Sequence, residues 1–592
     1  MSAAWESPSL TSVEYIRGPT SRNGDEVSCK GTALRIFTSG LMTVLTKPAC
    51  VGACALVTLV ILHQFENQVR HLPFAALCLT IIALLLNAIT TRPAFSVYAA
   101  SAFSLLICGV STIKYQMKGF DLHVYDLVYT TGDSEVLGFL AEEYGYLIAP
   151  VAALAVVGTF ALAGLFWFEQ KRRTKPTYVF FGFLAAVAAL PAAYPLDSSE
   201  PRYFHYLGGY NASSFFISLM DVQYLALESE LAGRLGRLPA QPPFADEVSC
   251  RPGEESPDVF VVLNESHTNP AYFPQLPGGL IADEFRSMDG RMRELQVETF
   301  GGGTWTTNFS VLTGLSSADF EAQSPFLTTF LESRVSGAIP ELMARCGYRT
   351  VAILPMRHSF VNEGPFLESI GFETVLDYEA IGANRYIHRD KFYFDAAEKV
   401  IAEHRRTDPR PLFLAMQTMF AHSPYSEELA GNATGPRHLV DDPELNEYLR
   451  RLVVSRADLQ TFLDARNETP TSRGTAILEF GDHQSFATKA LVDETSGPGS
   501  VADLGSLAYR THYALHAFGY EPRQVDAGDV RLDVGFVGAS FLDWAHLPTS
   551  PLFQSLLELR DLCEGKFYNC DNRSEVDLHL KRRIDSGLLQ LP

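Results

Sequence analysis

The chain has 592 residues, which is too long for one ordinary domain. It carries 68 acidic and 47 basic side chains, so its formal net charge is −21. This acidity argues against nucleic acid as a partner, because phosphate backbones bind basic surfaces. The first part of the chain, roughly two hundred residues, contains long apolar runs, whereas the rest is dense in Asp, Glu, Gly and Pro. The sequence therefore predicts a membrane part followed by a water-facing part.

Five apolar stretches in the first part are long enough to cross a membrane. A span needs about 20 residues to cross the ~30 Å hydrocarbon core. None of the stretches shows the polar face that an amphipathic helix of a soluble protein would have. We therefore predict a transmembrane domain of five helices over residues 48–196, with spans at 48–65, 73–90, 94–113, 146–168 and 177–194.

The basic residues near these spans predict their orientation, because short loops rich in Lys and Arg stay in the cytoplasm. Such residues precede the first span and lie in the loops after the second and fourth: Lys30, Arg35, Lys47, Arg92, Lys171, Arg172, Arg173 and Lys175. Residues 1–47 are thus predicted to be a cytoplasmic segment, and everything beyond Leu196 to lie outside the cytoplasm. No cleavable signal peptide is expected, because about forty mostly polar residues come first.

Two further segments face the outside in this interpretation. Residues 114–145 form a mixed apolar and acidic loop, which could lie along the membrane interface or cap the outer end of the bundle; the cap is the favoured arrangement. Residues 197–256 contain a stretch of helical character, followed by a run with Pro239, Pro242 and Pro243. This second segment is predicted to be a juxtamembrane helix and a linker.

From residue 257 to the C-terminus, short apolar runs alternate with longer stretches of helical character. The clearest runs are DVFVVLNES (258–266), RTVAILPM (349–356), PLFLAMQTM (411–419) and TAILEFGDH (475–483). Such a pattern is typical of a mostly parallel sheet with helices on both faces. The sequence therefore predicts an α/β domain over residues 257–592. Ligands of such sheets bind outside the carboxyl ends of the strands.

Polar residues follow two of the predicted strands and one glycine-rich turn. Glu265 ends the first strand, and Asp482 and His483 end the fourth. Between them, ETFGGGTWTTNFSVLTGL has three glycines before Thr304, where a helix can start. A hydroxyl at a helix N-terminus lies beside free N–H groups that favour an alkoxide or a phosphate. Alone, such a Thr is most often a helix cap. The joint order of the four residues is what indicates a catalytic site.

These four side chains suit a divalent metal ion. Two carboxylates, an imidazole and a hydroxyl form a hard, oxygen-rich set for Mn²⁺, Mg²⁺ or Zn²⁺. We expect Glu265, Thr304, Asp482 and His483 to bind one such ion, which would lower the pKa of the Thr304 hydroxyl and hold a phosphoryl oxygen. Thr304 is therefore the predicted nucleophile.

The cysteines fall into groups with different expectations. Four of them lie in the apolar stretches, where a free thiol behaves as a small hydrophobic group: Cys50, Cys54, Cys78 and Cys108. Cys563 and Cys570 flank a short polar segment that a disulfide could close in an oxidising compartment. For Cys250 and Cys346, the sequence leaves both a disulfide and two free thiols open.

The motifs and their order resemble a known group of enzymes. This group comprises the lipoteichoic acid synthases, phosphoglycerol transferases and phosphoethanolamine transferases of the alkaline phosphatase and sulfatase superfamily. The matching segments are VVLNES with Glu265, GGGTWTTNFSVLTGL with Thr304, FAHSPY with His422 and FGDH with Asp482 and His483. The five spans, the linker helix and an outside domain agree with it. The resemblance implies that these Glu, Thr, Asp and His residues bind the metal, with Mn²⁺ favoured, and that the Thr becomes covalently phospho-substituted.

The resemblance also implies roles for residues beyond the metal ligands. It makes His422 a catalytic and substrate-binding candidate, which would bind phosphate or protonate the leaving alcohol. His358, in LPMRHSFVNEGPF, is a further candidate for substrate binding, as is Asn308 on the helix of Thr304. The additional Trp and Arg pattern of lipoteichoic acid synthases is not found in this sequence.

The resemblance implies a two-step transfer from a membrane phospholipid through Thr304 to an acceptor. Phosphoglycerol, passed to a periplasmic glycan or glucan, is the favoured cargo, because GGGTWTTNFSVLTGL and LDWAHLPTSPLF resemble glucan-type phosphoglycerol transferases. Phosphoethanolamine transfer to lipid A or a glycan is the alternative, although lipid A transferases usually carry several disulfides. The resemblance places the chain in a bacterial inner membrane, as a monomer, with a periplasmic or extracellular catalytic domain.

Other functions have different requirements. A membrane-anchored phosphodiesterase, with water as the acceptor, would use the same residues. An arylsulfatase needs a Cys or Ser within a Cys/Ser-x-Pro-x-Arg motif, and the segment TWTTN that begins at Thr304 lacks it. A binding or scaffold protein with an inactive domain would have lost a metal ligand, whereas all four are present.

Overall fold

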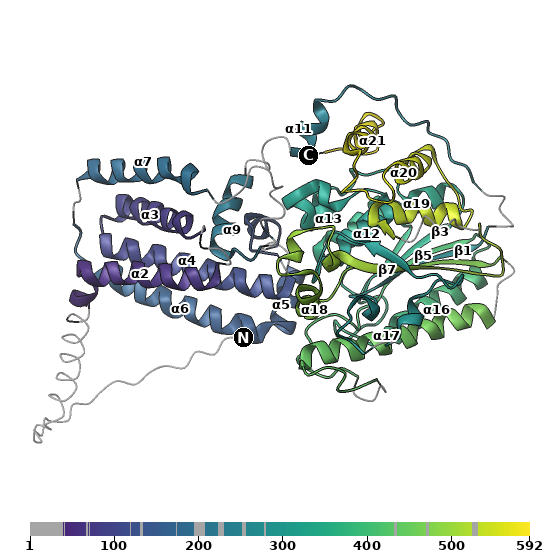
Figure 1. The fold of residues 1–592 in the computed structure, drawn as a ribbon, viewed down its shortest axis with the longest axis horizontal. Coiled ribbons are helices and arrows are strands. Elements are labelled where there is room, and N and C mark those ends of the chain that lie inside the picture. Colours follow the sequence, from purple (N-terminus) through teal and green to yellow (C-terminus); the bar gives the residue numbers. More distant parts are fainter. Residues whose placement is uncertain are drawn as a thin grey trace, which may run out of the picture.

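A computed structural model shows a helical bundle beside an α/β domain (Figure 1). It describes residues 40–591 except 41, 67–68, 70, 119, 131–133, 173–174, 195–205, 207, 223–229, 251–255, 278–279, 431–434, 469–472 and 524–530. Most of the predicted cytoplasmic segment 1–47 lies outside the described residues, as do Lys30, Arg35 and Arg173 of the orientation signal.

Five long apolar helices form the bundle. They are α2 (Pro48–Phe65), α3 (His71–Thr90), α4 (Pro93–Lys118), α6 (Gly145–Phe168) and α7 (Pro176–Ala193). All five are long and apolar enough to cross a membrane, which agrees with the predicted spans. Three of them begin with proline, whose missing N–H is not needed in the first turn of a helix. Ile89 and Phe160 point outward with exposed fractions of 79% and 74%, as lipid-facing side chains do.

The segment between α4 and α6 joins the bundle to the α/β domain. It contains the π-helical turn η1 (Asp126–Thr130) and α5 (Ser134–Glu143). Tyr125 is buried in one core cluster of the α/β domain, and Phe139 and Tyr144 are buried in the other. The expectation that this loop simply caps the bundle is therefore corrected, because its apolar side chains are shared with the neighbouring domain.

The predicted juxtamembrane helix and linker are present as shorter pieces. α9 (Asn211–Ser218) continues into η2 (Leu219–Val222), and α11 (Glu230–Gly236) follows after residues that lie outside the described part. The linker then pairs with the α/β domain at Ser249, which forms a β-bridge with Thr549. A disulfide between Cys250 and Cys346 also attaches the linker covalently to the α/β domain.

One mixed sheet of eight strands forms the centre of the α/β domain. The strands are β1 (Asp258–Asn264), β2 (Arg293–Gln296), β3 (Arg349–Ile353), β4 (Thr374–Leu376), β5 (Leu412–Gln417), β6 (Thr475–Gly481), β7 (Arg510–Phe518) and β8 (Arg531–Asp533). Their order is β4-β3-β5-β1-β6-β7-β2-β8, and β7 is antiparallel to both of its neighbours. The mostly parallel sheet is as predicted.

Helices cover both faces of this sheet. They are α12 (Thr304–Thr313), α13 (Leu327–Phe330), α14 (Ile339–Arg345), α15 (Glu363–Ser369), α16 (Asp390–Thr407), α17 (Pro443–Glu468), α18 (Lys489–Ser496), α19 (Val534–Trp544), α20 (Pro551–Leu562) and α21 (Arg573–Asp585). Along β1, Val259 and Val261 join the core cluster of α12 and α19, whereas Phe260 and Val262 join that of α16. Burial on both faces explains why the strand sequences are almost continuously apolar.

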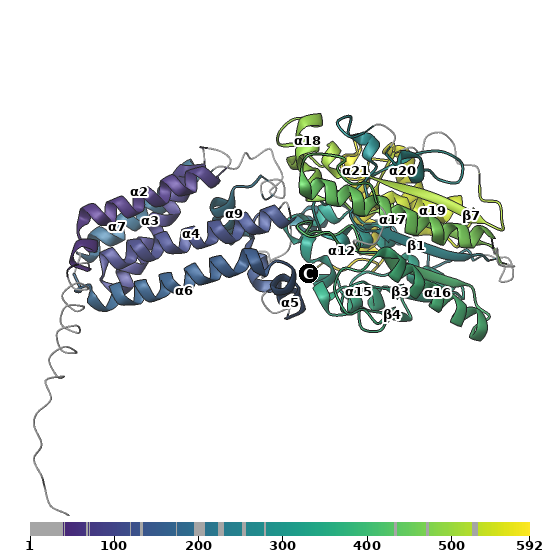
Figure 2. The same cartoon turned by 90° about the horizontal axis from the view of Figure 1, so that it is seen from below.

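The carboxyl ends of the central parallel strands face the bundle (Figures 1 and 2). Side chains of the bundle and of the α/β domain meet at this junction. The Tyr144 hydroxyl lies 2.8 Å from Ser423 Oγ, Phe139 packs against His422, and Tyr115 of α4 packs against Phe486. The edge of the sheet at which ligands are expected is therefore next to the membrane anchor.

Candidate active site

Four side chains converge at this edge of the sheet. Glu265 directly follows β1, and Asp482 and His483 follow β6, which pairs with β1 along its whole length. Thr304 is the first residue of α12. The preceding Gly303 has a φ of 90°, which a residue with a side chain rarely adopts, so the glycines permit the sharp entry into the helix.

Short distances connect these groups. Thr304 Oγ1 donates a hydrogen bond to Glu265 Oε2 at 3.0 Å and lies 3.4 Å from His483 Nε2. His483 Nε2 is 3.2 Å from Asp482 Oδ2 and 3.6 Å from Glu265 Oε1. The structure therefore brings together all four residues that were predicted to bind the metal.

Backbone groups and neighbouring hydroxyls hold the carboxylates in place. Asp482 Oδ1 accepts hydrogen bonds from the backbone N–H groups of Ser266 (2.7 Å) and His483 (2.9 Å). The Ser266 hydroxyl donates to Glu265 Oε1 at 2.8 Å, and the Glu265 N–H donates to the Thr418 hydroxyl at 3.2 Å. The strand ends of β1, β5 and β6 thus fix the orientation of the site.

The two carboxyl groups are buried together. Burial raises the pKa of Glu265 to about 7, and the negative charge of Asp482 adds to this effect. Burial likewise raises the pKa of Asp482 to about 6. Buried carboxylates are costly unless a positive charge compensates them. The site therefore favours a cation.

A divalent metal ion fits this set of donors. Ligand atoms of Glu265, Asp482 and His483 lie within 4.8 Å of one another, and all three residues are buried. Two carboxylate oxygens and an imidazole nitrogen are common ligands of Mn²⁺ and Zn²⁺. The Thr304 hydroxyl, at 3.0 Å from Glu265, is close enough to join them.

A second buried carboxylate network lies beside the first. Asn264, which precedes Glu265, donates to Glu479 Oε2 at 2.7 Å, and Arg456 Nη1 donates to the same oxygen at 2.8 Å. Although burial alone would raise it, the pKa of Glu479 is held well below its usual range by Arg456 and His512. The ion pair of Glu479 and Arg456 thus holds Asn264, the last residue of β1, through its hydrogen bond to Glu479.

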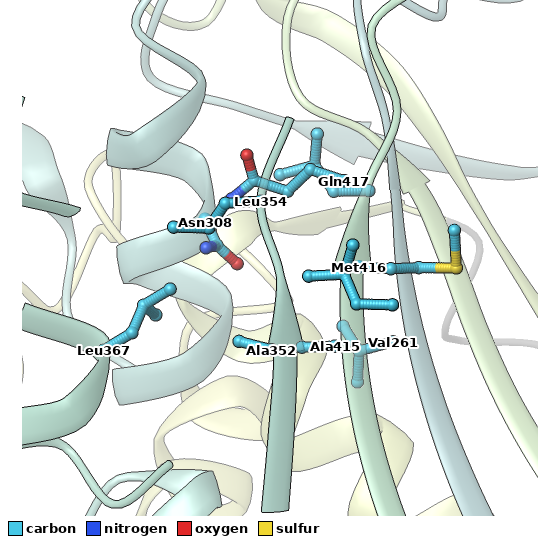
Figure 3. Close-up of a pocket in the computed structure, with 10 residues that line it drawn as sticks. Val261, Asn308, Ala352, Leu354, Leu367, Ala415, Met416 and Gln417 are labelled. Carbon is cyan, nitrogen blue, oxygen red and sulfur yellow. The ribbon is translucent and has the colours of Figure 1, made fainter. Parts of the chain in front are cut away.

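Asn308, predicted to bind substrate, contacts another acidic residue. Its Nδ2 donates to Glu363 Oε1 at 3.0 Å, and Gln417 Nε2 donates to the same oxygen at 2.7 Å. The Asn308 and Gln417 side chains lie at one end of a small pocket, whose other lining side chains, such as Leu367 and Ala352, are apolar (Figure 3). Sequence reasoning singled out neither Glu363 nor Gln417, although they lie in the segments LPMRHSFVNEGPF and PLFLAMQTM, because nothing local in those segments points to their contact with Asn308.

The two histidine candidates lie in different surroundings. His422 is almost fully buried after β5, its ring packs against Phe139, and its carbonyl accepts a hydrogen bond from Arg451 at 2.8 Å. His358 is partly exposed, and its Nε2 lies 3.0 Å from Glu368 Oε1. The structure gives no contact between His358 and the four metal-site residues among the described residues, so its substrate-binding role stays a prediction.

Two disulfides stabilise the α/β domain, and the sequence had left both of them open. They join Cys250 to Cys346 and Cys563 to Cys570. The four cysteines of the apolar helices are free thiols, as expected.

The part of the chain that contains most of the site matches a known family. Residues 294–500 match the family model described as Sulfatase. This range includes Thr304, His422, Asp482 and His483. The match confirms the predicted resemblance to the alkaline phosphatase and sulfatase superfamily.

Two curated relatives share part of their length with this chain. An uncharacterised protein of Haemophilus influenzae is 25% identical over 342 residues, which cover 55% of this chain and 60% of the relative. The capsular polysaccharide biosynthesis protein RkpI of Rhizobium meliloti is 27% identical over 248 residues, which cover 40% of this chain and 43% of the relative. The chain thus spans about half the length of these relatives.

Solved structures with some similarity include two transferases. The phosphoglycerol transferase GacH of Streptococcus pyogenes, in complex with sn-glycerol-1-phosphate, is 16% identical with a TM-score of 0.43, covering 62% of this chain and 91% of that chain. The integral membrane lipooligosaccharide phosphoethanolamine transferase A (EptA) of Neisseria meningitidis is 12% identical with a TM-score of 0.48, covering 86% of this chain and 95% of that chain.

Proposed function

We propose that this protein transfers the phosphate-containing head group of a membrane phospholipid, through a covalent Thr304 intermediate, to a glycan hydroxyl outside the cytoplasm. The position of Thr304 carries this proposal. Its hydroxyl is 3.0 Å from Glu265, in the first turn of α12, at the sheet edge that faces the membrane anchor (Figure 1). A nucleophile held there is close to where a phospholipid donor would lie.

In the first step, Thr304 Oγ1 attacks the phosphorus of the donor. The bond between phosphorus and the diacylglycerol oxygen breaks, and the head-group phosphate becomes an ester of Thr304. The Thr304 hydroxyl gives its proton to Glu265 Oε2, the oxygen that accepts its hydrogen bond. His422, in the loop after β5, gives a proton to the leaving diacylglycerol oxygen.

In the second step, an acceptor hydroxyl attacks the same phosphorus. The bond to Thr304 Oγ1 breaks and the head-group phosphate passes to the acceptor. The acceptor hydroxyl gives its proton to His422, and Thr304 regains its proton from Glu265. Glu265, Asp482, His483 and Thr304 would hold one divalent ion, with Mn²⁺ favoured. When bound, this ion stabilises the Thr304 alkoxide and the negative phosphoryl oxygens.

The donor and the acceptor follow from different observations. The sequence resemblance favours phosphatidylglycerol as the donor, with phosphatidylethanolamine as the alternative. A glycan acceptor is supported by the similarity to the capsular polysaccharide biosynthesis protein RkpI. The chain would act as a monomer, because one chain supplies every group that the proposed steps require.

The proposed location is the inner membrane of a bacterium, with the N-terminus in the cytoplasm and the α/β domain on the periplasmic or extracellular side. The basic residues of the inner loops support this orientation. The two disulfides of the α/β domain support it independently, because disulfides persist in oxidising compartments.

Mass spectrometry of the Thr304 peptide tests the proposed function. The full-length protein would be incubated with Mn²⁺ and phospholipid vesicles in the absence of an acceptor. We expect a phosphate-containing head group on Thr304 and none in a Thr304→Ala variant. Release of diacylglycerol without any adduct on Thr304 would contradict the proposal.

A further inference from the structure

Glu363 is a buried carboxylate without a cationic partner in the described part of the chain. Its side chain keeps only 7% of its surface exposed. Both of its hydrogen bonds come from neutral amides, Asn308 Nδ2 at 3.0 Å and Gln417 Nε2 at 2.7 Å, and both end on Oε1. No Lys, Arg or His among the described residues forms an ion pair with it. Glu479, which is fully buried, has Arg456 as its partner at 2.8 Å.

Both amides that bind Glu363 connect it to the active site. Asn308 is four residues after Thr304 on α12, so the two side chains lie on the same face, about one helical turn apart. Gln417 precedes Thr418, whose hydroxyl accepts a hydrogen bond from the Glu265 N–H at 3.2 Å. Glu363 is therefore hydrogen-bonded to two residues that adjoin the nucleophile and the proposed metal site.

Two amide groups hold one oxygen of the Glu363 carboxyl group. Burial raises the pKa of Glu363, whereas the hydrogen bonds from Asn308 and Gln417 favour the ionised form. Apart from Asn308 and Gln417, the neighbouring pocket is lined by apolar side chains (Figure 3). A charge in such a place interacts strongly with an opposite charge. A carboxylate beside a phosphate site repels the phosphate itself, whereas a cationic part of the ligand would favour the ionised form of Glu363.

We propose that Glu363 binds the ammonium group of the head group that is transferred, which makes phosphatidylethanolamine the donor. This inference rests on the proposed function. In phosphoethanolamine, two carbon atoms separate the ester oxygen from the ammonium nitrogen. Asn308 lies about one helical turn from Thr304, and the Glu363 carboxyl group is one hydrogen bond further, so an extended head group of this length points toward it. Phosphoglycerol ends in neutral hydroxyl groups, which cannot compensate a buried negative charge.

The chemistry of the first step is the same for this donor. Thr304 Oγ1 forms a bond to the phosphorus, the bond to the diacylglycerol oxygen breaks, and that oxygen takes up a proton. The ammonium group stays on Glu363 and changes neither its charge nor its bonds. Glu363 is thus a specificity-determining residue of this step.

The rate of adduct formation on Thr304 tests the inference, because this half-reaction needs no acceptor. Full-length protein with Mn²⁺ would be given vesicles of phosphatidylcholine mixed with either phosphatidylethanolamine or phosphatidylglycerol. We expect the wild type to react faster with phosphatidylethanolamine. Glu363→Gln should lower that rate on the order of 10- to 100-fold, because a hydrogen bond to a charged group is lost. The rate with phosphatidylglycerol should stay the same.

Two further variants separate binding from folding. Glu363→Asp keeps the charge and should recover part of the phosphatidylethanolamine rate. Glu373→Gln removes a partly exposed carboxylate that pairs with Arg410 at the surface, and it should behave like the wild type. The melting temperature of each variant in detergent shows whether it folds.

The possible negative results distinguish a failure of the Glu363 inference from a failure of the proposed function. A wild type that forms an adduct from phosphatidylglycerol in preference to phosphatidylethanolamine would overturn the role of Glu363 and leave the proposed function intact. Equal loss of both rates in Glu363→Gln, with a lower melting temperature, would also overturn it, because Glu363 would then be structural. Absence of any adduct on Thr304 of the wild type would overturn the proposed function itself.

Discussion

The rings of Phe139 and His422 pack edge to face, with centroids 5.8 Å apart and planes at 76°. Phe139 belongs to α5, between the apolar helices α4 and α6, whereas His422 follows β5 of the α/β domain. Five residues further along, the Tyr144 hydroxyl lies 2.8 Å from Ser423 Oγ. A loop of the membrane anchor thus forms one side of the region around a proposed catalytic histidine.

Replacing Phe139 by Ala should slow head-group transfer about 2- to 10-fold. An aromatic pair contributes about 0.5–1.5 kcal/mol beyond its buried area, and its loss would leave the His422 ring less well positioned. The turnover of the full-length protein in phospholipid vesicles measures this effect. Leu137→Ala is the matched control, because Leu137 lies on the same helix with 47% of its surface exposed. Equal turnover in both variants would show that the anchor only tethers the domain.

Thr304→Ala should lower the rate of transfer by roughly three orders of magnitude or more, because the nucleophile is lost. Thr304→Ser retains a hydroxyl at the same helix terminus and should keep measurable activity. Both rates can be followed by release of labelled diacylglycerol from vesicles. Thr306→Ser is the control within the same turn of α12, since the Thr306 hydroxyl bonds the Gly303 carbonyl at 2.7 Å instead of Glu265. Wild-type rates in Thr304→Ala would exclude Thr304 as the nucleophile.

Removal of divalent metal by a chelator should lower the melting temperature of the protein. A ligand at about 100 times its Kd stabilises the folded state by about 2.7 kcal/mol, and this contribution disappears with the ion. Adding Mn²⁺ back should restore the melting temperature of the wild type but not of Glu265→Gln. Asp395→Asn, which removes an exposed carboxylate that pairs with Lys391, should still respond to Mn²⁺. A melting temperature that changes neither with the chelator nor with Mn²⁺ would argue against the proposed metal site.

Arg456→Met should destabilise the α/β domain by about 3–5 kcal/mol, because it leaves the Glu479 carboxylate buried without its cation. The double variant Arg456→Met, Glu479→Gln should recover part of this loss, since the uncompensated charge is then removed. Thermal unfolding in detergent measures both. Arg406→Met, which breaks an exposed ion pair with Glu403, should have little effect. Equal melting temperatures for the single and double variants would mean that the Glu479 charge is compensated in another way.

The sequence by itself determined the spans, the central strands and the four polar residues that meet at the edge of the sheet. The five apolar helices and strands β1, β3, β5 and β6 agree with the predicted stretches. These elements are recognisable because burial on all sides requires continuous apolar runs, which are local in the sequence. The meeting of Glu265, Asp482 and His483 could be predicted for a related reason. Parallel strands end at one edge of a sheet, so the residues that follow them lie close together.

The remaining strands gave a weaker signal. β2, β4 and β8 have only four, three and three residues, which is too short for a periodic pattern. The antiparallel direction of β7 depends on its pairing with β6 and β2 rather than on its own residues. Strand order and direction were therefore settled by packing.

Tertiary structure alone decided which groups surround the nucleophile. Glu363 is separated from Asn308 and Gln417 by 55 and 54 residues, and an acidic residue at the start of a helix is ordinarily explained by the helix dipole. Phe139 looks like one more apolar residue of an outer loop, but it meets His422 across almost half of the chain. Such contacts arise from chain closure over long distances, and no local pattern in the sequence encodes them.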